Sequence, residues 1–406
     1  MKNKKLRYFM LVLSLCTLLM LPILVTTSSP TEGISLHPID IFSKSSGHYP
    51  TLDGEPLFTL HICVSDTSAI AIQVAGDISE SLYDIGVEGV VHEIPLLPYL
   101  HGLIPAYYGL SLQQPCKPGE PELVPYSEPQ DPIEITVMQG YDMALLGIGE
   151  YYYDVWQRFG TAYTGGTLNQ GYSNQTLDDL YSELEGLLIN WNANFPLHPD
   201  LNSAEGERAL EILSDLQSLW VEEQPSLVLH SRTNWDSAVT YFPTMLLNLR
   251  NDDLNIPEVR RAISLALDRV EIMNLYGYGS EWETNILQTW LPPWFPGYDS
   301  ALYPEQDILA ARQLLYDAGY TNIVVPDSII DVIDSYVADG TISSAGIGTS
   351  LTQRIDNAID LIAQGKYLPA KQQLISLINE LQSSAIPSAV EQELIAFVQQ
   401  IIDLLP

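Results

Sequence analysis

The fold class is decided by residues 57–94, LFTLHICVSDTSAIAIQVAGDISESLYDIGVEGVVHEI. Residues 57–64 are an apolar run of strand length. Behind them, apolar side chains recur at helical spacing, namely Ile70, Val74, Ile78, Leu82 and Ile85. Gly86 ends the predicted helix, and residues 87–94 are typical of a second strand. Strand, helix and strand joined by a short glycine turn predict a parallel α/β unit.

Beyond this unit, the pattern continues as α/β and then changes to all-α. A third strand is expected at 141–147, after an excursion loop rich in Pro, Gly and Tyr at 103–132. Further strands are expected at 227–230 and 244–249, and helices at 176–189, 203–221, 257–274 and 305–318. After Pro326 the residues are poor in aromatics and predict two or three helices within 350–405. We therefore expect a linker at 28–54, an α/β lobe at 55–325 and a small C-terminal all-α helical module at 326–406.

The charge balance argues against nucleic-acid partners. Lys and Arg total 17 against 51 Asp and Glu, which gives a net charge of −34. A field of that sign repels phosphate backbones and anionic lipid surfaces. The favoured interpretation is a highly solvated surface, and the alternative is an acid-lined site for a cationic ligand.

The N-terminus has the three parts of a secretory signal. Lys2, Lys4, Lys5 and Arg7 form a basic head, an apolar stretch covers 9–25, and small polar residues follow. The apolar stretch is at the lower limit of length for a membrane span, so residues 1–27 are a signal peptide or an N-terminal anchor. We expect an extracytoplasmic protein that is secreted or tethered by this segment.

Two cysteines remain after the signal, Cys63 and Cys116. In an oxidising compartment they could pair, whereas Cys63 could equally be a small buried hydrophobic residue in a strand.

Several motifs resemble those of one protein family. Residues 255–269 (NIPEVRRAISLALDR) and 310–320 (AARQLLYDAGY) carry most of the resemblance. Shorter matches are found at 82–87, 141–142 and 171–174, and in the turn from Glu222 to Pro225. Together they resemble the extracellular solute-binding proteins of family 5, the peptide- and nickel-type substrate-binding proteins of ABC transporters.

The resemblance implies a lobe like that of the type II periplasmic binding proteins. In that family the 255–269 and 310–320 motifs precede the strand that matches 82–87, whereas here they follow it. The order implies a circular permutation of one lobe, with new ends between the 310–320 helix and the strand near Phe58. The permutation predicts that these two elements lie side by side. No stretch matches the second lobe.

The resemblance also implies a ligand-binding loop after the strand at 141–147. The candidate ligand-binding residues are Glu150, Tyr151, Tyr152 and Asp154. A carboxylate there would pair with a ligand ammonium, and the tyrosines would supply amphipathic contact area. The alternative is a surface loop whose tyrosines pack on neighbouring helices. Arg260 and Arg261 are expected to form ion pairs on the helix surface.

Enzyme signatures are missing from the sequence. The seven histidines are scattered, and neither a His-Glu-x-x-His motif nor a phosphate-binding glycine loop is present. We expect no enzyme, no cofactor and no metal.

The leading hypothesis is a binding protein for an oligopeptide or another small polar solute, working with an ABC-type transporter permease. The alternative is a secreted structural or partner-binding protein that retains the lobe without transport, with a second chain able to supply the missing lobe. A hydrolase is the third hypothesis.

Overall fold

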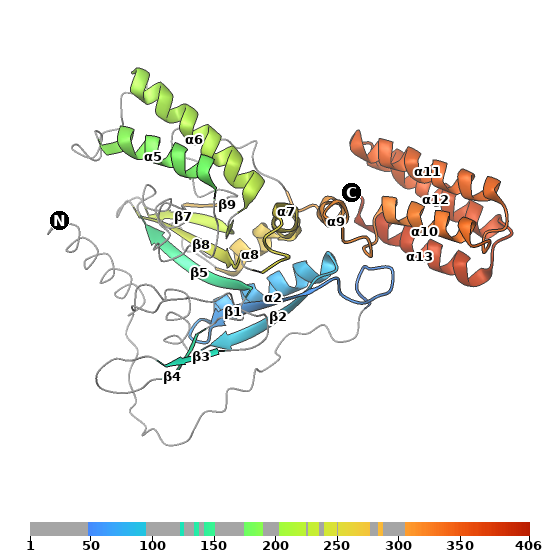
Figure 1. Cartoon of the computed structure of the whole chain (residues 1–406), viewed down its shortest axis with the longest axis horizontal. Helices are drawn as coiled ribbons and strands as arrows, with labels where there is room; N and C mark the ends of the chain where they lie inside the picture. The colour runs from blue at the N-terminus through green and yellow to red at the C-terminus, as the bar shows by residue number, and fades with distance from the viewer. Residues whose placement is uncertain are drawn as a thin grey trace. The chain divides into compact units, whose positions relative to one another are not determined.

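The computed structural model describes residues 48–94, 122–125, 134–137, 142–150, 174–189, 203–224, 226–234, 239–249, 251–276, 283–286 and 305–406. Strands and helices alternate in the first of these ranges and helices fill the last (Figure 1). Among the helices described, none is long and apolar enough to cross a membrane.

The parallel unit at the start of the lobe forms as predicted. Strand β1 (Thr59–Ser65) pairs in parallel with β2 (Glu88–Ile94), and helix α2 (Ala69–Asp84) connects them. Ser68 caps α2, because its hydroxyl accepts the N–H of Ala71. Gly86 has φ +79°, a left-handed conformation that glycine adopts without strain and that turns the chain into β2.

The described strands form one main sheet in the order β2-β1-β5-β8-β7-β9, with β6 also paired to β8. Their bounds are β5 Met143–Glu150, β6 Ser226–Val228, β7 His230–Asn234, β8 Val239–Leu247 and β9 Glu283–Ile286. Strand β5 is parallel to β1 and antiparallel to β8, so the sheet is mixed. The predicted α/β class is confirmed, and the fold is compatible with a lobe of the periplasmic-binding-protein kind.

A small second sheet corrects the expected excursion loop at 103–132. Strand β3 (Glu122–Pro125) falls inside that range and pairs antiparallel with β4 (Glu134–Val137). The prolines of this range argued against a strand. Pro125, however, is the last residue of β3, a position where the missing N–H of proline is tolerated.

Helices α5 (Gln175–Ile189) and α6 (Ala204–Glu223) lie close to their predicted ranges. The single helix expected at 257–274 is wrong, because the chain forms α7 (Pro257–Ala266) and α8 (Arg269–Leu275). The break is at Asp268, whose side chain accepts the N–H of Glu271 and starts a new helix. Arg269 stabilises the turn by donating to the carbonyl of Ser264.

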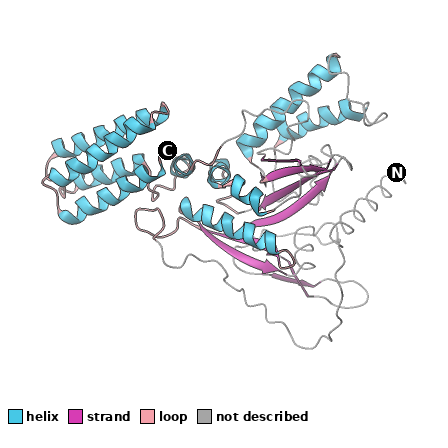
Figure 2. Cartoon of the chain, turned by 180° about the vertical axis from the view of Figure 1, so that it is seen from behind, coloured by secondary structure: helices cyan, strands magenta, loops and turns pink. Residues whose placement is uncertain are grey.

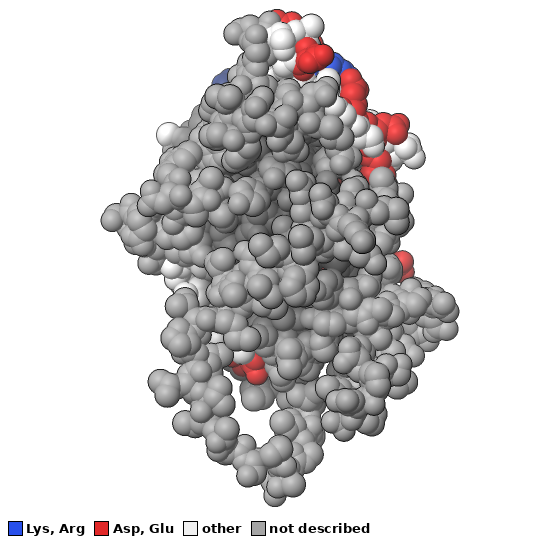
Figure 3. Space-filling view, turned by 90° about the vertical axis from the view of Figure 1, so that its left-hand side faces the viewer, with Lys and Arg blue, Asp and Glu red and all other residues white. Residues whose placement is uncertain are grey.

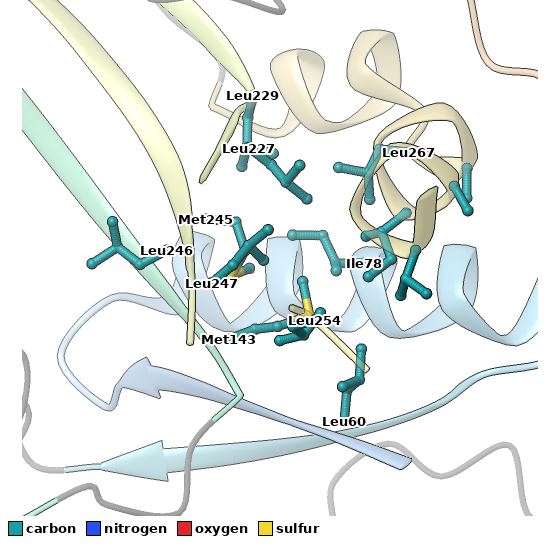
Figure 4. Close-up of a cluster of buried hydrophobic side chains, with 14 of the residues drawn as sticks. Leu60, Ile78, Met143, Leu227, Leu229, Met245, Leu246, Leu247, Leu254 and Leu267 are labelled. Carbon is teal, nitrogen blue, oxygen red and sulfur yellow. The ribbon is translucent and has the colours of Figure 1, made fainter. Parts of the chain in front are cut away.

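The core of the lobe is assembled from segments distant in the sequence. Side chains from β1, α2, β5, β8 and α7 meet in one apolar cluster (Figure 4). Leu60, Ile78, Met143 and Met245 are each 0% exposed. On the cluster's side of the sheet, Gly89 lets α2 approach β2 closely, since a Cβ there would lie 2.9 Å from the Cα of Ser79.

The two elements that the permuted order requires to be neighbours lie together. The rings of Phe58, just before β1, and Tyr320, just after α9 (Ile308–Asp317), have centroids 5.0 Å apart. The backbone around Thr51 also pairs with the chain at Ile323. The predicted proximity is confirmed, while the permutation itself stays a prediction. Residues 48–54, assigned to the linker, are thus packed against the lobe's end.

The C-terminal residues form four helices, α10 (Pro326–Ala338), α11 (Ala345–Ala363), α12 (Tyr367–Ser383) and α13 (Ser388–Leu404) (Figure 2). Their buried side chains make a second apolar cluster, separate from that of the sheet and including Ile355, Leu377 and Leu394. Strands are absent from residues 326–406.

Candidate functional site

The strand that leads to the predicted binding loop is anchored at its start by Asp142. One carboxylate oxygen accepts the backbone N–H of His61 at 2.7 Å, and the other accepts the side-chain N–H of Asn251 at 2.8 Å. The side chain is 1% exposed. Burial raises the pKa of Asp142 above its ordinary value, although the His61 N–H opposes the shift. The anchor joins β1, β5 and the turn before α7.

From this anchor, β5 and β8 run as an antiparallel pair toward the candidate loop. The register begins at Met143 opposite Leu247 and ends at Glu150 opposite Thr240. At about 3.3 Å per residue, Glu150 is about 23 Å along the strand from Met143. The pairing with β1 covers only Met143 and Ala144 of β5, so most of β5 is paired with β8 alone.

Of the predicted ligand-binding residues, only Glu150 lies within the described backbone, as the last residue of β5. Tyr151, Tyr152 and Asp154 lie outside the described residues. Strands β1, β2 and β5 are parallel, so the carboxyl end of β5 faces the same sheet edge as those of β1 and β2. In open α/β sheets, ligands bind outside the carboxyl ends of the strands, and the position of Glu150 agrees with this rule.

Arg260 is not the surface residue that the sequence suggested. Its guanidinium is 2% exposed and donates to the backbone carbonyls of Glu223, at 2.6 Å, and Leu254, at 2.8 Å. It also reaches the Glu223 carboxylate at 3.3 Å. The expectation of a surface ion pair fails because the side chain crosses from α7 to the end of α6. Arg261, by contrast, forms the expected pair with Glu258 at 2.9 Å.

Of the two alternatives for Cys63, a disulfide or a small buried residue in a strand, the structure shows the second. Cys63 is a buried free cysteine in β1, as expected of a small hydrophobic residue, and Cys116 lies outside the described residues. Burial raises the pKa of the Cys63 thiol, so it stays protonated.

The charged surface is acidic where it is described. On the face drawn in Figure 3, the charged side chains of the described residues are mostly Asp and Glu. One of the few basic residues, Arg208 of α6, pairs with Glu183 of α5 at 2.8 Å and with Glu211 of its own helix at 3.1 Å. The pair with Glu183 holds the pKa of that carboxyl below its ordinary value.

Sequence reasoning missed one pair of polar side chains that the structure brings together. The histidines appear scattered along the chain, but the pairing of β1 with β2 brings His61 and His92 together, with Nδ1 of His61 2.8 Å from Nε2 of His92. The signal was available, because parallel pairing of the two predicted strands places these positions on one face.

Comparison with known proteins gives one match. Residues 213–326 match the family described as bacterial extracellular solute-binding proteins, family 5 Middle. The matched span runs from the second half of α6 to the first residue of α10 and contains both long motifs, at 255–269 and 310–320. The motifs at 82–87, 141–142 and 171–174 lie outside it. No curated protein and no solved structure matches the chain.

Proposed function

Because residues 213–326 match family 5 of the bacterial extracellular solute-binding proteins, we propose that the chain binds an oligopeptide or another small polar solute outside the cytoplasm and delivers it to an ABC-type transporter permease. The observation that carries the proposal is the family match over residues 213–326. This span supplies β6 to β9 of the main sheet, and β8 in turn pairs with the strand that bears Glu150.

The proposed site lies after the carboxyl end of β5. Glu150 and Asp154 would pair with an ammonium group of the solute, while Tyr151 and Tyr152 would pack against its apolar part. The support for this role is that Asp142 holds the start of β5 and that the pairing of β5 with β8 continues to Glu150. A cationic solute agrees with the alternative interpretation of the net charge of −34, an acid-lined site.

A titration of paired variants tests the site. The probe is a pool of short oligopeptides with free N-termini, added to the full chain and followed by calorimetry. Glu150→Gln or Asp154→Asn should weaken binding by about 1.5–3 kcal/mol, the range for a charge-assisted hydrogen bond. Neutralising Glu258 instead, as Glu258→Gln, serves as the control, since its carboxylate pairs with Arg261 on α7. Equal affinity in all three variants would refute the site and leave the family match over residues 213–326 intact.

A second candidate function is binding of a protein partner that completes the cleft. The observation in its favour is the number of sheets among the described residues. They form one main sheet, enough for one lobe, and one two-stranded sheet, whereas a two-lobed binding protein encloses its ligand between two lobes. Analytical ultracentrifugation of the purified chain, together with any proteins that co-purify with it, distinguishes the two candidate functions. A monomer that binds the peptide pool supports the first, and a stable heteromer that binds peptide only as a complex supports the second.

A further inference from the structure

His61 and His92 form a pair of imidazoles held by neighbouring strands. Nδ1 of His61 lies 2.8 Å from Nε2 of His92, the ring centroids are 5.0 Å apart and the rings are tilted by 45°. The register of β1 and β2 places His92 opposite Cys63, two residues beyond His61 along the same strand. Both histidines lie on strands that are paired along their whole length, so the sheet backbone holds the two facing ring nitrogens close together.

The pair lies on the side of β1 and β2 that α2 does not cover. Leu60 and Ile62, which alternate with His61, are 0% exposed, and Gly89 makes the close approach to Ser79 of α2. Successive side chains of a strand point to opposite faces, so the imidazoles point away from α2. Both histidines are half-buried.

The separation of the two nitrogens suits a shared metal ion. A divalent transition metal sits about 2.0–2.1 Å from each imidazole nitrogen, and two such ligands at a right angle are about 3 Å apart. The observed 2.8 Å needs only a small rotation of either ring to reach this value. From this geometry we infer that His61 and His92 form a two-histidine clamp for a borderline divalent ion such as Zn²⁺, Ni²⁺ or Cu²⁺.

A change of tautomer can free both facing nitrogens for a metal ion. As a hydrogen-bonded pair, one of the facing nitrogens carries the proton and the other offers its lone pair. Metal binding needs both lone pairs, so the donor imidazole shifts its proton to its other ring nitrogen and stays neutral. For a pair of neutral imidazoles this change of tautomer releases no proton. The metal ion then takes the place of the hydrogen atom that lay between the two facing nitrogens.

The nearest other candidates do not complete the coordination. Cys63 is 5% exposed, and both oxygens of Asp142 accept N–H groups, of His61 and Asn251. Among the residues described, no group of three or more His, Cys, Asp and Glu could hold a metal. Among the described residues the clamp thus has two ligands, and imidazole ligands select transition metals over Mg²⁺ and Ca²⁺.

Calorimetric titration of the full chain with Zn²⁺ alone tests the clamp, with Mg²⁺ as the control for cations attracted by the acidic surface. The test variants are His61→Asn and His92→Gln, whose amides retain hydrogen-bonding groups. The control variant is His230→Gln in β7, which is separated from β1 in the sheet by β5 and β8. Each test variant should weaken Zn²⁺ binding at least tenfold, and the control should match the parent chain.

Two results would overturn the clamp. One is Zn²⁺ affinity that is unchanged in both test variants, or no greater than that for Mg²⁺. The other comes from nuclear magnetic resonance of the imidazoles in the parent chain, which needs no variant to fold. Zn²⁺ should shift the nitrogen signals of two of the seven histidines first, and shifts that leave the His61 and His92 signals unmoved would refute the assignment. Neither result depends on peptide binding, so the clamp and the proposed transport function can fail separately.

Discussion

Replacing Arg260 by alanine should destabilise the lobe strongly, whereas the same change at its neighbour should not. Arg260 is 2% exposed and bonds to the carbonyls of Glu223 and Leu254. Each buried carbonyl left without a donor costs about 1–3 kcal/mol. The Glu223 carboxylate is 26% exposed and can turn to water. We therefore expect Arg260→Ala to lower the free energy of unfolding by about 3 kcal/mol.

Arg261→Ala is the matched control, because it removes the same side chain from the same helix. Its pair with Glu258 is partly exposed, at 34% and 39%, and surface pairs contribute about 0–1 kcal/mol. Urea unfolding followed by tryptophan fluorescence measures the difference within the lobe, since all seven tryptophans precede Pro326. Equal losses in the two variants would refute the structural role given to Arg260.

Two further pairs of measurements examine the packing and the pH dependence. Gly89→Ala should lower the free energy of unfolding by about 1–3 kcal/mol, and with it the melting temperature, because the new Cβ would lie 2.9 Å from the Cα of Ser79. Gly186→Ala is the control, because a Cβ there would have no atom within 4 Å. It should raise the free energy of unfolding by up to about 1 kcal/mol, since alanine has the higher helix propensity. The hydrogen bond from the Ser350 hydroxyl holds the pKa of Glu380 below its ordinary value. The ionised Glu380 carboxylate therefore stabilises the fold above the unfolded carboxyl pKa of about 4.3. This stabilisation is lost as the pH falls through the lowered pKa of the folded state. Glu380→Gln should therefore lower the free energy of unfolding at neutral pH, by no more than about 1 kcal/mol, and change it little in acid; a loss independent of pH in urea titrations would contradict this.

Local signals in the sequence were sufficient for the first unit of the fold. The apolar run before Ser65, the helical spacing through Leu82 and the glycine turn at Gly86 act within a few residues of one another, so strand, helix and strand could be predicted with their order and direction. The proximity of Phe58 and Tyr320 is non-local, and it was predicted only because the family motifs occur here in permuted order.

Features that depend on tertiary contacts were missed. The break at Asp268 interrupts a continuous apolar stripe, and nothing in the spacing separates its capping role from that of a surface carboxylate. Arg260 lies next to Arg261 in sequence, and only the packing of α7 on α6 distinguishes the buried arginine from the exposed one. In the candidate site, the sequence predicted a strand at 141–147 with Glu150 in the loop after it, whereas β5 continues to Glu150, and the buried contacts of Asp142 that fix the start of the strand were missed.

The most direct test of the central claim is a thermal-unfolding screen of the full chain against short oligopeptides and other small polar solutes. A ligand that binds only the folded state raises stability by about 2.7 kcal/mol at a hundredfold excess over its dissociation constant. We predict a saturable upward shift of the tryptophan-reported transition with at least one solute, strongest for solutes that carry an ammonium group. If no solute in the screen raises that transition, the proposal that this protein is a solute-binding component of a transporter is contradicted.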